Sequence, residues 1–116
     1  MSLGSDGEAI ARKYLEEKGY ELVKENFRYD RAEIDLIMKD EKLKQLVFVE
    51  VKTRKTKTFG EPQESVNELK QLQLIKSAEG FMLNDEEYTD YEKRFDVIAI
   101  YIENGKETIN HLENAF

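Results

Sequence analysis

The chain has 116 residues, with 18 Lys and Arg against 25 Asp and Glu, one His, no Cys and a formal net charge of −7. This length fits one domain, and we expect residues 1–116 to fold as a single unit that buries a real core. The absence of cysteine excludes a disulfide framework and a thiolate zinc site. The acidic balance argues at first sight against a nucleic-acid partner.

The beginning of the chain has no basic region followed by an apolar stretch, as a targeting segment would. Uninterrupted apolar runs such as Leu46–Val49 are far shorter than the ~20 residues that cross a bilayer. We therefore expect a cytoplasmic protein with no membrane partner.

The charge is unevenly spread along the chain. Residues 21–60 carry 10 basic and 8 acidic groups, whereas residues 61–116 carry 5 and 13. Much of the acidic excess lies in residues 84–92, which hold five acids and no base. This tract is interpreted either as a solvated loop or as a contact for a basic partner.

The first half of the chain predicts one helix followed by three strands. Capping-box spacing from Ser5 to Glu8 predicts a helix start, and Gly19 stands where that helix should end. Three segments with strand-like content follow, at residues 20–29, 33–39 and 46–54.

The second half of the chain predicts one helix and two strands. Asn67 is expected to cap a helix whose apolar face carries Leu69, Leu72, Ile75, Ala78 and Met82. Strands at residues 94–103 and 106–112 are joined by Asn104-Gly105, a good hairpin turn. The order α-β-β-β-α-β-β predicts one α/β domain in which helices flank a mixed central sheet.

A carboxylate interrupts the most apolar strand. Residues 46–51 are apolar on both parities, which is typical of a central strand covered on both faces, yet Glu50 lies among them. Lys52 falls on the same face as Glu50, because strand side chains alternate with a period of two. A buried carboxylate is costly without a compensating cation. Lys52 could be that cation in a purely structural ion pair.

Asp35 lies in the preceding apolar strand and gives a second interpretation. If the two strands form a hairpin, Asp35 and Glu50 converge on one side of the sheet. Two close carboxylates repel each other unless a divalent cation lies between them, and oxygen ligands suit Mg²⁺ or Mn²⁺. Such a metal clamps a phosphate and activates a water, while the Lys52 ammonium orients that water or stabilises the growing negative charge.

Asp35 and the residues around Glu50 form a known motif. Asp35 with Glu50-Val51-Lys52 resembles the PD-(D/E)XK nuclease motif, and the element order resembles the restriction-endonuclease-like core of that superfamily. Further motifs are spread over nearly the whole length of the chain, and they include Gly7-Glu8-x-x-Ala11, Asn26-x-Arg28, Glu33-Ile34-Asp35, Val49-Glu50-Val51-Lys52-x-Arg54, Phe59-Gly60-x-Pro62, Arg94-Phe95-Asp96-Val97 and His111-x-x-Asn114-Ala115-Phe116. In these motifs the chain resembles the bacterial YraN family, whose fold is held to be similar to archaeal Holliday-junction resolvases.

The resemblance implies a role for each matching residue. Asp35 and Glu50 would be metal ligands together with the Val51 carbonyl, and Lys52 would be the catalytic lysine. Glu8 matches a helix-borne acid that approaches the same metal, although capping-box spacing also explains it. The family usually has Gly where this chain has Ala32, and several arginines where this chain has residues 71–74, QLQL.

Four basic residues are candidates for phosphate contact. Arg28, Arg54 and Lys57 are expected near the strand ends around Asp35 and Lys52. Lys70 lies on the second helix, where it either touches a phosphate or is a solvated helix position. For His111, the one imidazole, we expect a structural or surface role.

These observations predict a metal-dependent endonuclease that hydrolyses DNA, with branched or junction DNA as a candidate substrate and Mg²⁺ or Mn²⁺ as its cofactor. By analogy with junction resolvases, we expect a homodimer, because a four-way junction has two-fold symmetry. The alternative is a nuclease-fold module that binds nucleic acid or a protein partner without cleaving.

Overall fold

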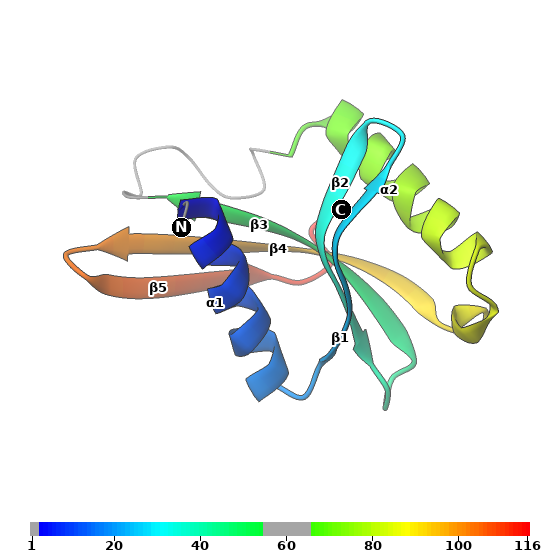
Figure 1. Ribbon diagram of the computed structural model, residues 1–116, viewed down its shortest axis with the longest axis horizontal. Helices are drawn as coiled ribbons and strands as arrows, with labels where there is room; N and C mark the ends of the chain where they lie inside the picture. Colours follow the sequence, from blue (N-terminus) through cyan, green and yellow to red (C-terminus); the bar gives the residue numbers. More distant parts are fainter. Residues whose placement is uncertain (1–2, 55–65) are drawn as a thin grey trace.

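The computed structural model describes the backbone of residues 3–54 and 66–116 (Figure 1). The first half of the fold comprises α1 (Leu3–Glu17), β1 (Glu21–Tyr29), β2 (Ala32–Asp40) and β3 (Gln45–Arg54). The second half comprises α2 (Glu68–Leu83), a short 3₁₀ helix η2 (Glu86–Tyr88), β4 (Glu92–Glu103) and β5 (Lys106–Leu112). The predicted α-β-β-β-α-β-β order is confirmed.

The five strands form one mixed sheet in the order β1-β2-β3-β4-β5. β1, β2 and β3 are antiparallel neighbours, β3 and β4 are parallel, and β5 returns antiparallel to β4. The parallel pair requires a crossover, which α2 supplies. β3, the strand that carries Glu50 and Lys52, is therefore central, as its apolar sequence predicted.

The two helices cover opposite faces of the sheet. Along β3, Leu46 and Phe48 belong to the cluster that includes Leu74 and Ala78 of α2. Val47 and Val49 belong instead to the cluster that includes Ala11 and Leu15 of α1. Because alternate residues of a strand face opposite sides, each helix packs on its own face. None of the helices described in residues 3–54 and 66–116 is long and apolar enough to cross a membrane.

The sheet bends at Asp35, and this bend creates the candidate site. Ile34 packs in the α2-side cluster, whereas Leu36, two residues later, packs on the α1 side. Residues two apart normally share a face, so the alternation is interrupted at Asp35. On β1, Asn26 lies opposite this point and has a positive φ of 51°. In Figure 1 the β1–β2 hairpin accordingly rises away from β3, β4 and β5.

One local prediction was wrong in part and another was wrong altogether. α2 has the predicted Asn67 cap, whose side chain accepts a hydrogen bond from the Lys70 amide, but Leu69 and Leu72 are 66% and 65% exposed. The buried residues of α2 are Leu74, Ser77, Ala78 and Gly80. The predicted stripe was right at Ala78, which is buried, and at Ile75 and Met82, which pack against the α2-side cluster, and wrong at Leu69 and Leu72. Apolar residues lie on nearly every side of this helix, so helical spacing alone did not exclude the two exposed leucines. α1 begins at Leu3, so Ser5 is not its N-cap and the capping-box interpretation of Glu8 fails.

The acidic tract at residues 84–92 is more ordered than a solvated loop. It contains η2, and the Asp85 side chain caps this turn by accepting from the Glu87 amide. Tyr88 and Tyr91 are buried in the α2-side cluster and meet edge to face. The acidic side chains Glu86, Glu87 and Asp90 remain exposed.

Candidate active site

Glu50 is the centre of the predicted site and is buried, with only 7% of its side chain exposed. Its Oε1 atom lies 3.1 Å from Lys52 Nζ and 2.9 Å from Lys70 Nζ of α2. Its Oε2 atom is also buried, and it has no hydrogen-bond partner among the described residues. Two ammonium groups therefore share one carboxylate oxygen, while the other oxygen keeps both lone pairs available to a ligand.

Asp35 lies where β2 and β3 separate. The paired register of the two strands runs from Asp40↔Gln45 to Leu36↔Val49. One residue further along, the Asp35 carboxylate takes the place of a backbone acceptor, and the Val51 amide donates to its Oδ2 at 2.8 Å. The split in the sheet thus aims the Asp35 side chain at the backbone next to Glu50.

The surroundings of Asp35 favour its protonated form. Burial, followed by the negative charge of Glu50, raises the pKa of Asp35 to about 7, although the Val51 amide opposes the shift. Glu8 contributes further to the raised pKa. Neighbouring carboxylates that raise each other's pKa are one arrangement in which oxygen ligands bind a divalent cation, although here Lys52 and Lys70 already contact Glu50.

Glu8 reaches this cluster because α1 approaches β3 closely. A Cβ atom added to Gly7 would overlap Thr53 Oγ1, so any other residue here would force the Thr53 side chain or the helix to shift. With its amide nitrogen facing the neighbouring carboxylates, the Asn26 side chain donates to Glu8 Oε1 and to Glu33 Oε1, both at 3.1 Å. The sequence places Asn26 in a family motif but gives no sign that its side chain bridges Glu8 and Glu33.

A cavity of about 200 Å³ opens beside Asp35, and its walls are contributed by Glu8, Ala9, Glu25, Asn26, Asp35 and Leu36. A hollow of about 460 Å³ at the far end of α2 contains none of the predicted site residues. Within residues 3–54 and 66–116, no three acidic or histidine side chains gather as a complete ligand set. The orphaned Glu50 Oε2 and the Asp35 carboxylate are oxygen donors of the kind that suit a divalent cation whose other ligands are largely water.

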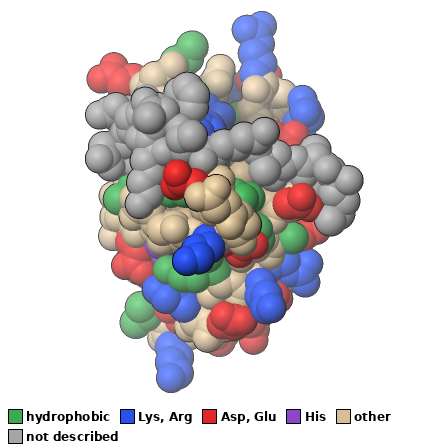
Figure 2. Space-filling view, turned by 90° about the vertical axis from the view of Figure 1, so that its left-hand side faces the viewer, with side chains coloured by type: hydrophobic (Ala, Val, Ile, Leu, Met, Phe, Trp, Pro, Cys, Tyr) green, Lys and Arg blue, Asp and Glu red, His purple; other side chains and the backbone are tan. Residues whose placement is uncertain are grey.

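The predicted phosphate-contacting residues differ in their surroundings. Lys70 contacts Glu50, so it is not the freely solvated helix position considered above. Arg28 is 73% exposed and pairs with Glu33 at 3.0 Å, and Arg54 donates to the Thr53 carbonyl at the end of β3. Lys57 lies outside the described residues. Figure 2 shows basic and acidic side chains interspersed among the described residues on the face at the left of Figure 1.

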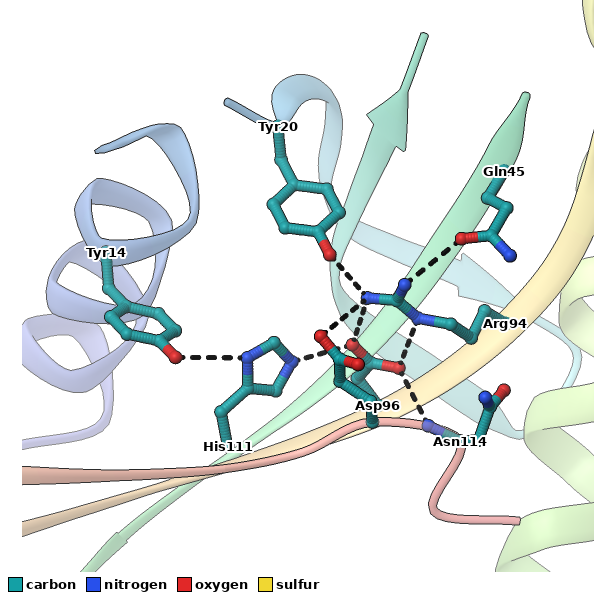
Figure 3. Close-up of polar contacts among 8 residues, drawn as sticks. Tyr14, Tyr20, Gln45, Arg94, Asp96, His111 and Asn114 are labelled. Carbon is teal, nitrogen blue, oxygen red and sulfur yellow. Dashed lines mark hydrogen bonds and ion pairs between the residues drawn. The ribbon is translucent and has the colours of Figure 1, made fainter. Parts of the chain in front are cut away.

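A second buried polar cluster surrounds Asp96 on β4 (Figure 3). Asp96 is fully buried and forms two hydrogen bonds with Arg94, at 2.9 and 2.8 Å. His111 Nε2 lies 2.7 Å from the same carboxylate, and the backbone amide of Asn114 donates to Asp96 Oδ1 at 3.2 Å. The cluster extends outward as Tyr14 OH contacts His111 Nδ1, and as Arg94 donates to Tyr20 OH and Gln45.

This cluster joins α1, β3, β4 and β5, so its role is structural. Burial raises the pKa of Asp96, but the bonds from His111 and Arg94 outweigh burial and hold the pKa below its usual value. The sequence predicted a structural or a surface role for His111. Its side chain is only 5% exposed although β5 is an edge strand, so the structural role is the one that the structure supports. The sequence held a signal, since Arg94 and Asp96 are two charges on one face of an apolar strand.

Comparison with known proteins gives the family. The model of the uncharacterised protein family UPF0102 matches residues 7–100, which include every element from the second turn of α1 into β4. The chain belongs to this family. The YraN-like resemblance drawn from the sequence is thereby confirmed.

Relatives that carry the UPF0102 name match along almost their whole length. The protein of Caldanaerobacter subterraneus subsp. tengcongensis is 42% identical over 99% of this chain and 94% of its own length. The protein of Natranaerobius thermophilus is 45% identical over 99% of this chain and 97% of its own. That of Caldicellulosiruptor bescii is 45% identical over 98% and 96%. The single α/β domain described here therefore corresponds to nearly the entire length of these UPF0102 proteins.

Proposed function

We propose that this UPF0102 protein is a metal-dependent endonuclease that hydrolyses phosphodiester bonds in DNA, with branched or junction DNA as the candidate substrate. The observation that carries the proposal is the buried Glu50 carboxylate, which has one oxygen without a partner and lies beside a second carboxylate of raised pKa. The order of elements, with a parallel strand after an antiparallel hairpin, supports it through its resemblance to the restriction-endonuclease-like core.

Asp35, Glu50 and the Val51 carbonyl would hold Mg²⁺ or Mn²⁺. When bound, such a cation supplies a water of lowered pKa and neutralises charge on the scissile phosphate. Asp35 must give up its proton to become a ligand, since its pKa of about 7 leaves it partly protonated at neutral pH. Glu8 lines the same cavity as Asp35 and would add a third carboxylate near the cation.

Lys52 is the candidate catalytic residue. Its side chain is only 16% exposed, and the contact with Glu50 holds its ammonium beside the carboxylate that would bind the metal. From that position a fixed positive charge stabilises the negative charge that develops on a pentacoordinate phosphate. A lysine held in place before the substrate arrives adds no reorganisation cost to the reaction step.

The acidic chain is compatible with a DNA substrate because its charge is unevenly distributed. Residues 21–60, which include Asp35, Glu50 and Lys52, carry 10 basic and 8 acidic groups. A divalent cation adds further positive charge at the site. The net charge of −7 nevertheless predicts modest, salt-sensitive affinity. If the substrate is a four-way junction, two copies would act together, as its two-fold symmetry requires.

One observation favours a second candidate, a nuclease-fold module that binds DNA or a protein without cleaving it. Lys52 and Lys70 both contact Glu50 Oε1, so the buried charge already has protein partners. The lack of arginines at residues 71–74 of α2 also limits phosphate contacts. Uptake of metal by wild-type protein separates the two candidates, because the non-cleaving module does not need it.

The proposal is tested by incubating the protein with Mg²⁺ or Mn²⁺ and single-stranded, duplex, flap and four-way DNA. We expect metal-dependent cleavage of at least one substrate, and loss of that cleavage in Lys52→Ala. Lys76→Ala is the matched control, since Lys76 is 66% exposed and pairs only weakly with Asp30 at 3.6 Å. Cleavage that survives Lys52→Ala, or no cleavage of any substrate, contradicts the proposal.

A further inference from the structure

Lys70 holds a place at the candidate site that a solvated helix residue would not have. Its Nζ atom lies 2.9 Å from Glu50 Oε1, closer than Lys52 Nζ at 3.1 Å. Lys70 comes from the first turn of α2, so a helix on one face of the sheet supplies a cation to the central strand. The side chain of Lys70 is 37% exposed, whereas that of Lys52 is 16% exposed. Of the two ammonium groups, that of Lys70 has the easier path away from Glu50.

The charge balance at the site indicates what Lys70 does. Asp35 and Glu50 are crowded acids, and Lys52 alone supplies a single positive charge to the pair. Burial lowers the pKa of Lys70, but the hydrogen bond and charge of Glu50 outweigh burial and raise it, so its ammonium is charged at neutral pH. A second positive charge therefore reaches the carboxylates from Lys70. A divalent cation bound there would supply two positive charges itself.

We propose that Lys70 is a positioning residue that stands in for the divalent cation: it neutralises Glu50 in the metal-free protein, competes with the metal for that carboxylate, and is released when the metal binds. The inference rests on the proposed function, because it needs a metal at Asp35 and Glu50. Once released at the mouth of the site, the Lys70 ammonium is available to a phosphate oxygen. Metal binding would thereby be coupled to exposure of a cation that recognises the DNA backbone.

The competition is measured by calorimetric titration of metal-free protein with Mn²⁺. We expect Lys70→Met to bind Mn²⁺ about tenfold more tightly than wild type. In this variant the metal no longer has to break the charged hydrogen bond between Lys70 and Glu50. Lys76→Met removes the same charge from an exposed position of α2 and should change the affinity little. The difference should persist at about 1 M salt, where long-range charge effects are screened within about 3 Å.

The release of Lys70 is measured on the wild-type protein, so it does not depend on the stability of a variant. An amine-reactive reagent labels exposed lysines, and peptide mass spectrometry gives a labelling rate for each one. We expect the rate at Lys70 to rise several-fold when Mg²⁺ is added, and the rate at Lys76 to stay constant.

The outcomes separate this inference from the proposed function. If neither wild type nor Lys70→Met takes up Mn²⁺, the proposed function fails, and the inference fails with it. If wild type binds Mn²⁺ but Lys70→Met binds it no more tightly and the labelling of Lys70 is unchanged, only the inference is overturned. Tighter binding by Lys70→Met together with faster labelling of Lys70 supports both.

Discussion

Asp96→Asn is the substitution whose effect on stability follows most directly from the structure. Asp96 is fully buried and receives two hydrogen bonds from Arg94, which is itself only 7% exposed. The substitution removes the negative charge and leaves the buried guanidinium with only Glu113 as a carboxylate partner, a half-exposed side chain whose Oε1 lies 3.8 Å from Arg94 Nη2. Breaking one partner of a buried ion pair costs about 3–5 kcal/mol. For a domain of this size, that loss lowers the melting temperature by roughly 12–20 °C.

The assay is thermal and urea unfolding followed by circular dichroism, with Glu107→Gln as an exposed control for the same loss of charge. A second variant, Arg94→Met combined with Asp96→Asn, should recover more than about 1 kcal/mol, because the buried cation is removed as well. A loss below about 1 kcal/mol for Asp96→Asn, or no recovery in the double variant, would refute the argument that this buried ion pair stabilises the fold.

The same pair predicts a pH dependence. The pKa of Asp96 is lowered in the folded protein, so its contribution to stability is complete above the unfolded-state pKa of about 3.9 and is lost as the pH falls through the folded value. The stability difference between wild type and Asp96→Asn should therefore shrink below about pH 4. A difference that stays constant down to pH 2 would contradict this sign.

The remaining predictions concern the site and its supports. Gly7→Ala should cost about 1–3 kcal/mol because its methyl group overlaps Thr53 Oγ1, and Thr53→Ala in the same chain should restore part of that loss in urea unfolding. Leu72→Ala, at a position 65% exposed, should change stability by less than about 0.5 kcal/mol, whereas Leu74→Ala should cost about 2–5; similar losses would refute the observed burial of α2. Since the pKa of Asp35 is about 7, Mn²⁺ uptake should release a proton at pH 6 but little at pH 8.5, as buffer-dependent heat would reveal; equal release at both would contradict it.

Much of the fold could be predicted from local patterns. The apolar run through residues 46–51 identified the central strand because a strand covered on both faces has no polar side. The Asn67 cap and the Asn104-Gly105 turn were predicted because both depend on a few neighbouring residues. Glu50 and Lys52 were predicted to share a face from the two-residue period, and their 3.1 Å contact confirms it.

The rest depended on contacts between distant segments. Asn26 bridges Glu8 and Glu33 only because β1 bends opposite Asp35, and no short-range signal announces that bend. The exposure of Leu69 could not be predicted, since α2 is apolar on nearly every side. Lys70 reaches Glu50 from 20 positions away, so its helix periodicity gives no indication of the contact.

The central claim is that Asp35 and Glu50 together hold a divalent cation, and Mn²⁺ binding to the metal-free protein tests it most directly. Calorimetry on wild type, Asp35→Asn and Glu50→Gln should give a saturable isotherm for wild type and loss of that isotherm in both variants, with Glu107→Gln unchanged. Absence of Mn²⁺ binding by folded wild-type protein, or binding that persists in Asp35→Asn and Glu50→Gln, would contradict the account.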